Sequence, residues 1–324
     1  MNERIIWIDY LRGICMLMIL WFHTEMYYAG RDVLPYNLYV ANALTTFYFI
    51  SGYLFYAEKK FSWNRKLHSI FRGIVLPYFF FTIILAIPKA LMNDLPIHQV
   101  LLKILLGNGS WFVSSLIVAE IAFTFVLIIK SKCIIYIVQI TCLFLAYLLT
   151  DTNISMRHNY WNFHNALIGM FFLCLGYEYH QHEKCFQIFH RLSQLLLLLI
   201  AFITIKIYVI YSGTSLLVEP VNISNYPLFF VDTIIGILLF IAIAKRLSHL
   251  PWLIWTGRHS LVYYFFCGAV PMTVAKGLTL LHIPYNNHYY LIPIAFVLVY
   301  IITTAITWLA YHYLPFSSTP ASAQ

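Results

Sequence analysis

The feature that most constrains the fold of this chain is the recurrence of apolar stretches of about 20 residues along its whole length. A helix of about 20 residues crosses a hydrocarbon core of about 30 Å and satisfies its own backbone hydrogen bonds in lipid. Hydrophobic residues make up 61% of the 324 residues and charged residues only 10%, against about 25% charged residues in soluble proteins. The sequence therefore predicts an all-α integral membrane protein.

The apolar stretches predict about ten transmembrane helices. These helices are expected at residues 7–28, 38–56, 70–91, 111–129, 133–149, 163–179, 193–211, 226–244, 259–280 and 289–311. The connections between them are short, and no linker rich in Pro, Ser or Gly interrupts the series. We therefore predict one membrane domain over residues 1–316 and a short cytoplasmic tail over residues 317–324.

The positions of Lys and Arg predict the orientation, because basic loops resist translocation. With the amino terminus in the cytoplasm, most basic residues fall on the inner side and few remain outside, and an even number of helices places both termini in the cytoplasm. The basic segment after the second helix contributes Lys59, Lys60, Arg65, Lys66 and Arg72 to the inner side. The net charge of +8 is then mainly a topology signal, so no nucleic acid partner is expected.

The first apolar stretch, residues 7–28, also resembles a removable export signal in its position. His23 and Glu25 interrupt it, however, and no small-residue cleavage site follows. We therefore expect this stretch to remain as the first helix. The six cysteines are scattered without the spacing of metal ligands, so no metal site is predicted.

Placing an ionisable side chain inside a membrane costs about 3 kcal/mol on insertion scales. Each such residue is therefore a functional candidate. Arg12 and His23 are eleven residues apart, which brings them within about 20° of one helix face and separates them by about 16 Å along the axis. Asp9 precedes Arg12 by three residues, a spacing that allows a carboxylate to hold a guanidinium in one orientation. One helix face then combines anion binding near the cytoplasm with proton transfer further out.

Structural alternatives exist for each of these residues. Arg12 can extend its side chain to the inner headgroups, and His23 can hydrogen-bond a neighbouring helix. Glu25 can orient or compensate the charge of His23, although residues two apart point to different sides of a helix. These alternatives stay open at the level of the sequence.

The stretch "IDYLRGICMLMILWFH" resembles the opening signature of acyltransferase family 3, polytopic membrane acyltransferases with an arginine, ten residues and a histidine on the first helix. Further segments resemble those of the family in the same order. They are "FYFISGYLF", "KLHSIFRGIVLPYFFF", "GSWFVSSLIVAEI", "FFLCLGYEY" and "TGRHSLVYYFF". The resemblance covers nearly the whole chain, with one departure: many members have a histidine where this chain has Cys267.

The resemblance implies transfer of an acyl group, usually acetyl, from cytoplasmic acyl-CoA to a hydroxyl group of a cell-surface glycan or lipid-linked sugar. Acyl-CoA is then a co-substrate, and no resident cofactor is expected. The lipid bilayer and the glycan acceptor are the other partners. The expected location is the inner (plasma) membrane, crossed several times.

The residue types fit this chemistry. Phosphates of CoA require guanidinium groups, and Arg12 and Arg72 lie on the predicted cytoplasmic side, although topology alone also explains the neighbouring lysines. His23 suits a general base that deprotonates the acceptor hydroxyl, and a covalent acyl-enzyme is the less favoured variant. The predicted catalytic residues are His23 and Glu25. The predicted acyl-CoA-binding residues are Asp9, Arg12, Ser51, Gly52 and Arg72, with close helix packing as the alternative for Ser51 and Gly52.

Further polar and aromatic residues are candidates for the cavity. Glu120 lies near the middle of a predicted span, which suggests a cavity wall. Trp111 is placed at the outer mouth, where both an aromatic belt and sugar stacking are consistent with it. Lys206 and Asp232 fall at similar depth and are expected to pair with each other as a structural ion pair. Trp161, His158 and His164 share the outer position of Trp111.

A transporter or flippase for a surface-polysaccharide precursor is the alternative function, because buried charges also line substrate pathways. The sequence contains no inverted repeat and no matched pair of helices broken by Gly or Pro, which disfavours it. A non-enzymatic membrane scaffold does not explain the shared face of Arg12 and His23.

Overall fold

The computed structural model describes residues 5–56, 61–92, 96–150, 159–219 and 221–314. Within these residues, seven helices are long and apolar enough to cross a membrane, or eight if one bent pair counts as a single span. The predicted all-α membrane fold is confirmed. The count of ten spans and the cytoplasmic position of both termini stay predictions. Lys59, Lys60, His158 and the tail 317–324 lie outside the described residues.

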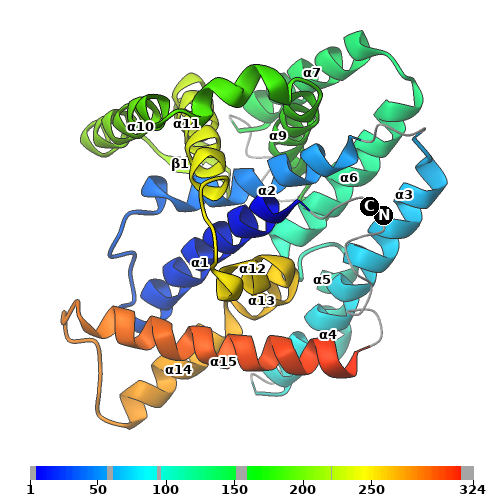
Figure 1. The fold of residues 1–324 in the computed structure, drawn as a ribbon. Coiled ribbons are helices and arrows are strands. Elements are labelled where there is room, and N and C mark those ends of the chain that lie inside the picture. The colour runs from blue at the N-terminus through cyan, green and yellow to red at the C-terminus, as the bar shows by residue number, and fades with distance from the viewer. Residues whose placement is uncertain (1–4, 57–60, 93–95, 151–158, 220, 315–324) are drawn as a thin grey trace. The chain divides into compact units, whose positions relative to one another are not determined.

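The chain forms two compact units. Figure 1 shows their helices as coiled ribbons. The first unit comprises Met1–Leu44, Ile188–Thr214 and Pro227–Ser318, and the second comprises Thr45–Gln187, Ser215–Tyr226 and Thr319–Gln324. The helices of the first unit are α1 (Ile6–Tyr28), η1 (Tyr36–Leu38), α10 (Leu192–Ser212), α11 (Tyr226–Ala244), α12 (Pro251–Arg258), α13 (Ser260–Phe266), α14 (Ala269–Leu280) and α15 (Leu291–Tyr313). Helix α2 (Val40–Phe55) and helix η4 (Glu183–His190) continue from one unit into the other, and Tyr226, the first residue of α11, belongs to the second unit.

The second unit is also almost entirely helical in its described part. Its other elements are α3 (Trp63–Ile70), η2 (Phe71–Val75), α4 (Leu76–Met92), α5 (Ile97–Leu105), α6 (Trp111–Ile128), α7 (Lys132–Thr150), η3 (Tyr160–Asn162) and α9 (Phe163–Gln181), with strands β1 (Leu216–Leu217) and β2 (Asn222–Ile223). The two strands form a short antiparallel hairpin in which Leu216 pairs with Ile223. Apart from this hairpin, no strand occurs among the described residues.

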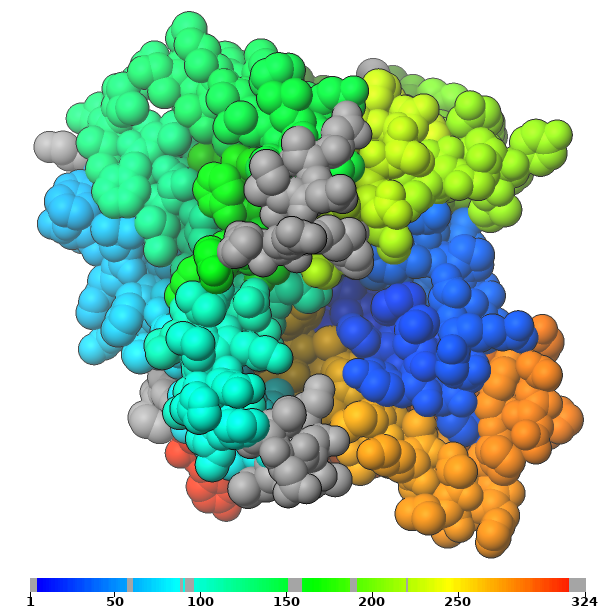
Figure 2. Space-filling model, turned by 180° about the vertical axis from the view of Figure 1, so that it is seen from behind, coloured from blue at the N-terminus to red at the C-terminus, as the bar shows by residue number. Residues whose placement is uncertain are grey.

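Helix α1 is the centre of the first unit. It packs against α12, α13, α14 and α15, and Leu11, Cys15 and Met16 on α1 are completely buried. Figure 2 shows the blue amino-terminal segment and the orange segment around α14 side by side. There, Tyr28 donates a hydrogen bond of 2.9 Å to the carbonyl of Ile283. The helix that carries the predicted site is therefore held on several sides.

Glycines bring helix backbones into direct contact in both units. A Cβ atom on Gly257 of α12 would lie 1.8 Å from the carbonyl oxygen of Asp9 on α1. In the second unit, a Cβ atom on Gly52 of α2 would lie 1.8 Å from the carbonyl oxygen of Leu173 on α9. Close contact through small residues is a main source of helix association in lipid, where the hydrophobic effect between helices is absent.

A helix lies at each of the ten predicted positions, but the predicted span 259–280 is broken into α13 and α14, which are bent by 48°. Pro271 provides the reason, because proline has no N–H to donate to the carbonyl of Cys267, four residues before it. Short helices α3, α5 and α12 were not predicted, since each alone is too short to cross the hydrocarbon core.

The contact between α1 and α12 predicts a sharp difference between two glycines of the first unit. Gly257→Ala is expected to lower stability by about 1–3 kcal/mol, because the new methyl group meets backbone. Gly277→Ala, on α14, is expected to be neutral or slightly stabilising, because nothing lies within 4 Å of the new atom. Thermal unfolding of both purified variants in detergent measures the effect, and equal melting temperatures would contradict the described contact.

Candidate functional site

Helix α1 is continuous from Ile6 to Tyr28 and carries both Arg12 and His23. Because no break intervenes, the helical rise separates the two Cα atoms by about 16 Å, as the sequence predicts. Both side chains are half-buried, whereas Leu11 and Leu20 nearby are completely buried. The site candidates thus lie on the less enclosed part of an otherwise well-packed helix.

The imidazole of His23 lies among aromatic rings. The Tyr27 ring stacks beside it with 6.3 Å between centroids and an angle of 22°, and the Phe22 ring meets it edge-on at 5.5 Å. Tyr27 is 45% exposed. Within the described part of the chain, the His23 imidazole makes no hydrogen bond, so a bond to a neighbouring helix is not observed there. Its ring nitrogens can therefore serve a substrate.

The carboxylate of Glu25 holds the turn that follows α1. Its Oε1 accepts a hydrogen bond of 2.7 Å from the Trp21 indole, and its Oε2 accepts bonds of 3.2 Å from the backbone N–H groups of Val33 and Leu34. Glu25 is completely buried, and it makes no hydrogen bond to His23 among the described residues. Its observed contacts fix the chain just beyond His23.

Asp9 lies in the first turn of α1, where the helix dipole favours a negative charge. Its Oδ2 accepts a hydrogen bond of 3.2 Å from Nε of Arg258 at the end of α12. Sequence analysis did not identify Arg258, because 249 residues separate it from Asp9. The Arg258 side chain remains 42% exposed, so its guanidinium combines an anchored Nε with access to a ligand.

The structure brings together Ser51, Glu120 and Lys66 in the second unit. The Ser51 hydroxyl on α2 donates a hydrogen bond to Glu120 Oε1 on α6. Nζ of Lys66 lies 4.0 Å from Glu120 Oε2 and 3.7 Å from the ring centroid of Phe55. The sequence predicted a role for each of these residues separately but not their contact.

The other two predicted donor-site residues of the second unit differ in their surroundings. Gly52 is buried where the backbones of α2 and α9 meet, which favours the packing interpretation. Arg72 is exposed in the π-helical turn η2 and forms no ion pair among the described residues. Turns of this kind often occur at functional sites, so Arg72 is available to an anionic ligand.

The aromatic residues predicted at the outer mouth have different roles. Trp111 is half-buried at the start of α6, with its ring edge-on to Phe112 at 5.7 Å. Trp161 has a positive φ of 53° and donates its backbone N–H to the carbonyl of Leu106. His164 is buried and bonds the carbonyl of Ala146 at 2.9 Å. His164 is thereby committed to packing within the second unit.

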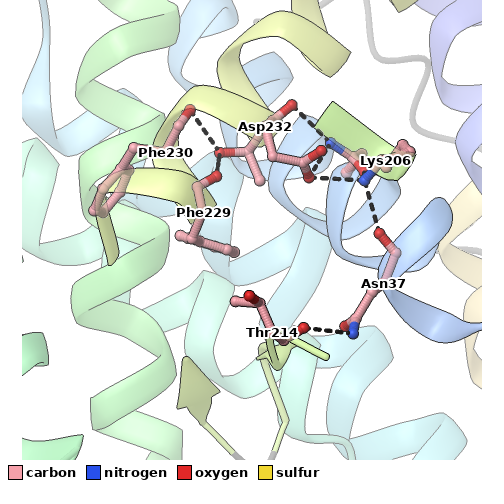
Figure 3. Close-up of polar contacts among 8 residues, drawn as sticks. Asn37, Lys206, Thr214, Phe229, Phe230 and Asp232 are labelled. Carbon is pink, nitrogen blue, oxygen red and sulfur yellow. Dashed lines mark hydrogen bonds and ion pairs between the residues drawn. The ribbon is translucent and has the colours of Figure 1, made fainter. Parts of the chain in front are cut away.

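The predicted pair of Lys206 and Asp232 is confirmed, with 2.7 Å between Nζ and Oδ2 (Figure 3). Nζ of Lys206 also donates to the carbonyl of Asn37 at 2.7 Å and to Oδ1 of Asn42 at 2.6 Å. Asn37 in turn donates to the carbonyl of Thr214 at 3.0 Å. The buried ammonium thus has a partner for each of its three protons, which supports the structural interpretation.

The chain was compared with known proteins. A family model described as "Acyltransferase domain" matches residues 5–312. The matched region includes the predicted residues on α1 and the Ser51–Glu120 contact. The comparisons with curated proteins and with solved structures found no match.

The Lys206–Asp232 pair predicts strong non-additivity between two substitutions. Lys206→Met is expected to cost about 3–5 kcal/mol, because it leaves the Asp232 carboxylate buried without its cation. Adding Asp232→Leu should restore much of this loss, because no buried charge then remains. Unfolding of the single and double variants in micelles measures the coupling, and simple addition of the two effects would argue against the ion pair.

Proposed function

Because this chain belongs to the acyltransferase family whose model it matches over residues 5–312, we propose that this membrane enzyme transfers acetyl from cytoplasmic acyl-CoA to a glycan hydroxyl. The acceptor is a cell-surface glycan or a lipid-linked sugar, and the proposed location is the bacterial inner membrane. Acyl-CoA acts as a co-substrate. The proposed modification is O-acetylation of a surface polysaccharide.

The observation that supports this mechanism best is the half-buried His23 imidazole, which makes no hydrogen bond among the described residues. In the proposed reaction, His23 accepts the proton of the acceptor hydroxyl while that oxygen attacks the thioester carbonyl. The carbon–sulfur bond breaks, and the CoA thiolate receives the proton from His23. The products are an ester and free CoA, with the imidazole returned to its neutral form.

In the proposed donor site, guanidinium groups hold the phosphates of CoA. Arg12 on α1 is the candidate of the first unit and Arg72 in η2 that of the second, and the sequence predicts both on the cytoplasmic side. Asp9 anchors Arg258 at the amino-terminal end of α1, which adds a second guanidinium to the first unit. The sequence predicts that Asp9 orients the Arg12 guanidinium, and in this proposal Asp9 orients the Arg258 guanidinium as well.

The remaining predicted residues take supporting roles in this proposal. Glu25 positions the chain beyond His23 through its bonds to Val33 and Leu34. Ser51 orients the Glu120 carboxylate, and Gly52 allows α2 to approach α9. Trp111 offers an aromatic face for the sugar acceptor. We assign proton transfer to His23 alone.

A transporter or flippase remains the second candidate, because the bent pair α13–α14 resembles the broken helices of transporters. Transporters usually contain such helices as a matched pair. Only one bent pair occurs among the described residues. This observation favours the enzyme over the carrier.

Substitutions on α1 separate the two proposed roles. His23→Ala is expected to lower kcat by about 10²–10⁴-fold with little change in the KM for acyl-CoA, because it removes the base. Arg12→Ala is expected to raise the KM for acyl-CoA, because it removes a phosphate contact. Transfer of labelled acetyl from acetyl-CoA to acceptor by purified protein measures both, with His288→Ala as the matched histidine control.

Full turnover by His23→Ala would refute the proposed base. Cells that carry His23→Ala distinguish the two candidates. If the protein is the enzyme, their surface glycans lose the acyl groups. If it is a carrier, the variant still transports its solute. Mass spectrometry of surface polysaccharide from cells with and without the protein identifies the acceptor. A mass difference of one acyl group supports the enzyme.

A further inference from the structure

The carboxylate of Glu120 is the most unusual buried group that the proposed proton transfer does not use. Its side chain is only 6% exposed, on a helix with no other acidic or basic residue in its described sequence. A buried charge is costly unless it is both paired and hydrogen-bonded. The contacts of the two Glu120 oxygens therefore indicate which kind of hydrogen-bond donor this carboxylate can still bind.

The two oxygens of Glu120 differ in their contacts. Oε1 accepts the hydrogen bond from Ser51, whereas Oε2 is buried and has no hydrogen-bond partner among the described residues. Lys66 Nζ lies 4.0 Å from Oε2, which is within ion-pair distance but beyond a hydrogen bond. The negative charge is thus compensated, while the capacity of Oε2 to accept a hydrogen bond remains. Such a site suits a neutral N–H or O–H donor rather than a second cation.

Other buried carboxylates are engaged differently. Both oxygens of Glu25 accept hydrogen bonds, from three donors in all. Asp232 also has a buried oxygen without a partner among the described residues, Oδ1, but its Oδ2 holds Lys206 in a direct ion pair at 2.7 Å. Glu178 on α9 also has a buried oxygen without a partner among the described residues, but its side chain is only half-buried. Glu120 combines nearly complete burial with a cation held just outside hydrogen-bond distance.

The surroundings of Glu120 combine apolar and basic side chains. Phe55, Ala119 and Phe123 belong to one buried apolar cluster beside it. Lys66 stands on α3, where Arg65 is exposed, and η2 follows with the exposed Arg72. Ligand sites commonly combine an apolar lining with a few polar groups that fix orientation. This one suits a ligand with an anionic head and a slender arm that carries amide N–H groups.

We propose that Glu120 Oε2 accepts a hydrogen bond from an amide N–H of the pantetheine arm of the acyl donor. Ser51 orients the carboxylate, and Lys66 balances its charge. This assignment rests on the proposed function, because it requires acyl-CoA as the donor. Glu120 is then a donor-recognition residue with no part in proton transfer.

A series of shortened donors tests the subsite. Acetyl-CoA and S-acetylpantetheine both contain the arm, whereas ethyl thioacetate contains no amide. Glu120→Gln is expected to lower kcat/KM about tenfold or more for the first two donors, as loss of a hydrogen bond to a charged group would. The ratio of wild type to Glu120→Gln should be close to one for ethyl thioacetate. The acceptor KM should not change.

Matched variants keep this test independent of folding. Because the donors are compared within one variant, partial unfolding would lower all three rates equally. Glu178→Gln makes the same chemical change on α9 and should leave the three donors in their wild-type ratio. Ser51→Ala should reproduce the Glu120→Gln pattern more weakly, because it removes only the group that orients the carboxylate.

An equal loss for all three donors, or a change confined to the acceptor KM, would overturn the subsite. Turnover of all donors by the wild type with no effect of Glu120→Gln would overturn it as well, while leaving the proposed function intact. If the wild type turned over no thioester at all, the proposed function would fail first and the subsite with it. The two failures are therefore distinguishable.

Discussion

The interior of a membrane offers no water, so each backbone and charged group placed there needs a partner within the protein. Helices meet the backbone requirement, and their association then depends on close contact rather than on hydrophobic burial. Gly257 against Asp9 in the first unit and Gly52 against Leu173 in the second show such contacts. The position of α1, and with it the position of Arg12 and His23, follows from this constraint.

Much of the fold could be predicted from the sequence, because apolar length is a local property. Helices α6, α7, α10 and α11 begin and end within about two residues of the predicted spans, as expected of long apolar segments. The bend between α13 and α14 was missed because the run stays apolar through Pro271, although the hydrogen bond to Cys267 is lost there. Hydropathy indicates whether a segment lies in lipid, but it does not indicate where the helix is interrupted.

The candidate site was predictable only where its residues share one helix. Arg12 and His23 follow from their spacing, because helical geometry fixes their relation. The bonds of Asp9 to Arg258 and of Ser51 to Glu120 join residues that are 249 and 69 positions apart. Periodicity indicates which face of a helix is buried, but it does not identify the side chain on the facing helix. Long-range partners therefore required the structure.

Hydrogen-bond capacity separates structural charges from candidate functional ones. Lys206 donates all three protons within the protein, and both oxygens of Glu25 already accept hydrogen bonds there. Among the described residues, the His23 imidazole makes no hydrogen bond and Glu120 Oε2 has no hydrogen-bond partner. Asp232 Oδ1 also has none, but Lys206 holds the Asp232 carboxylate directly through Oδ2. An unsatisfied buried group lowers stability, and in our proposal a ligand completes Glu120 Oε2 during function. The requirement that buried polar groups find partners thus underlies both the membrane helices and the proposed substrate contacts.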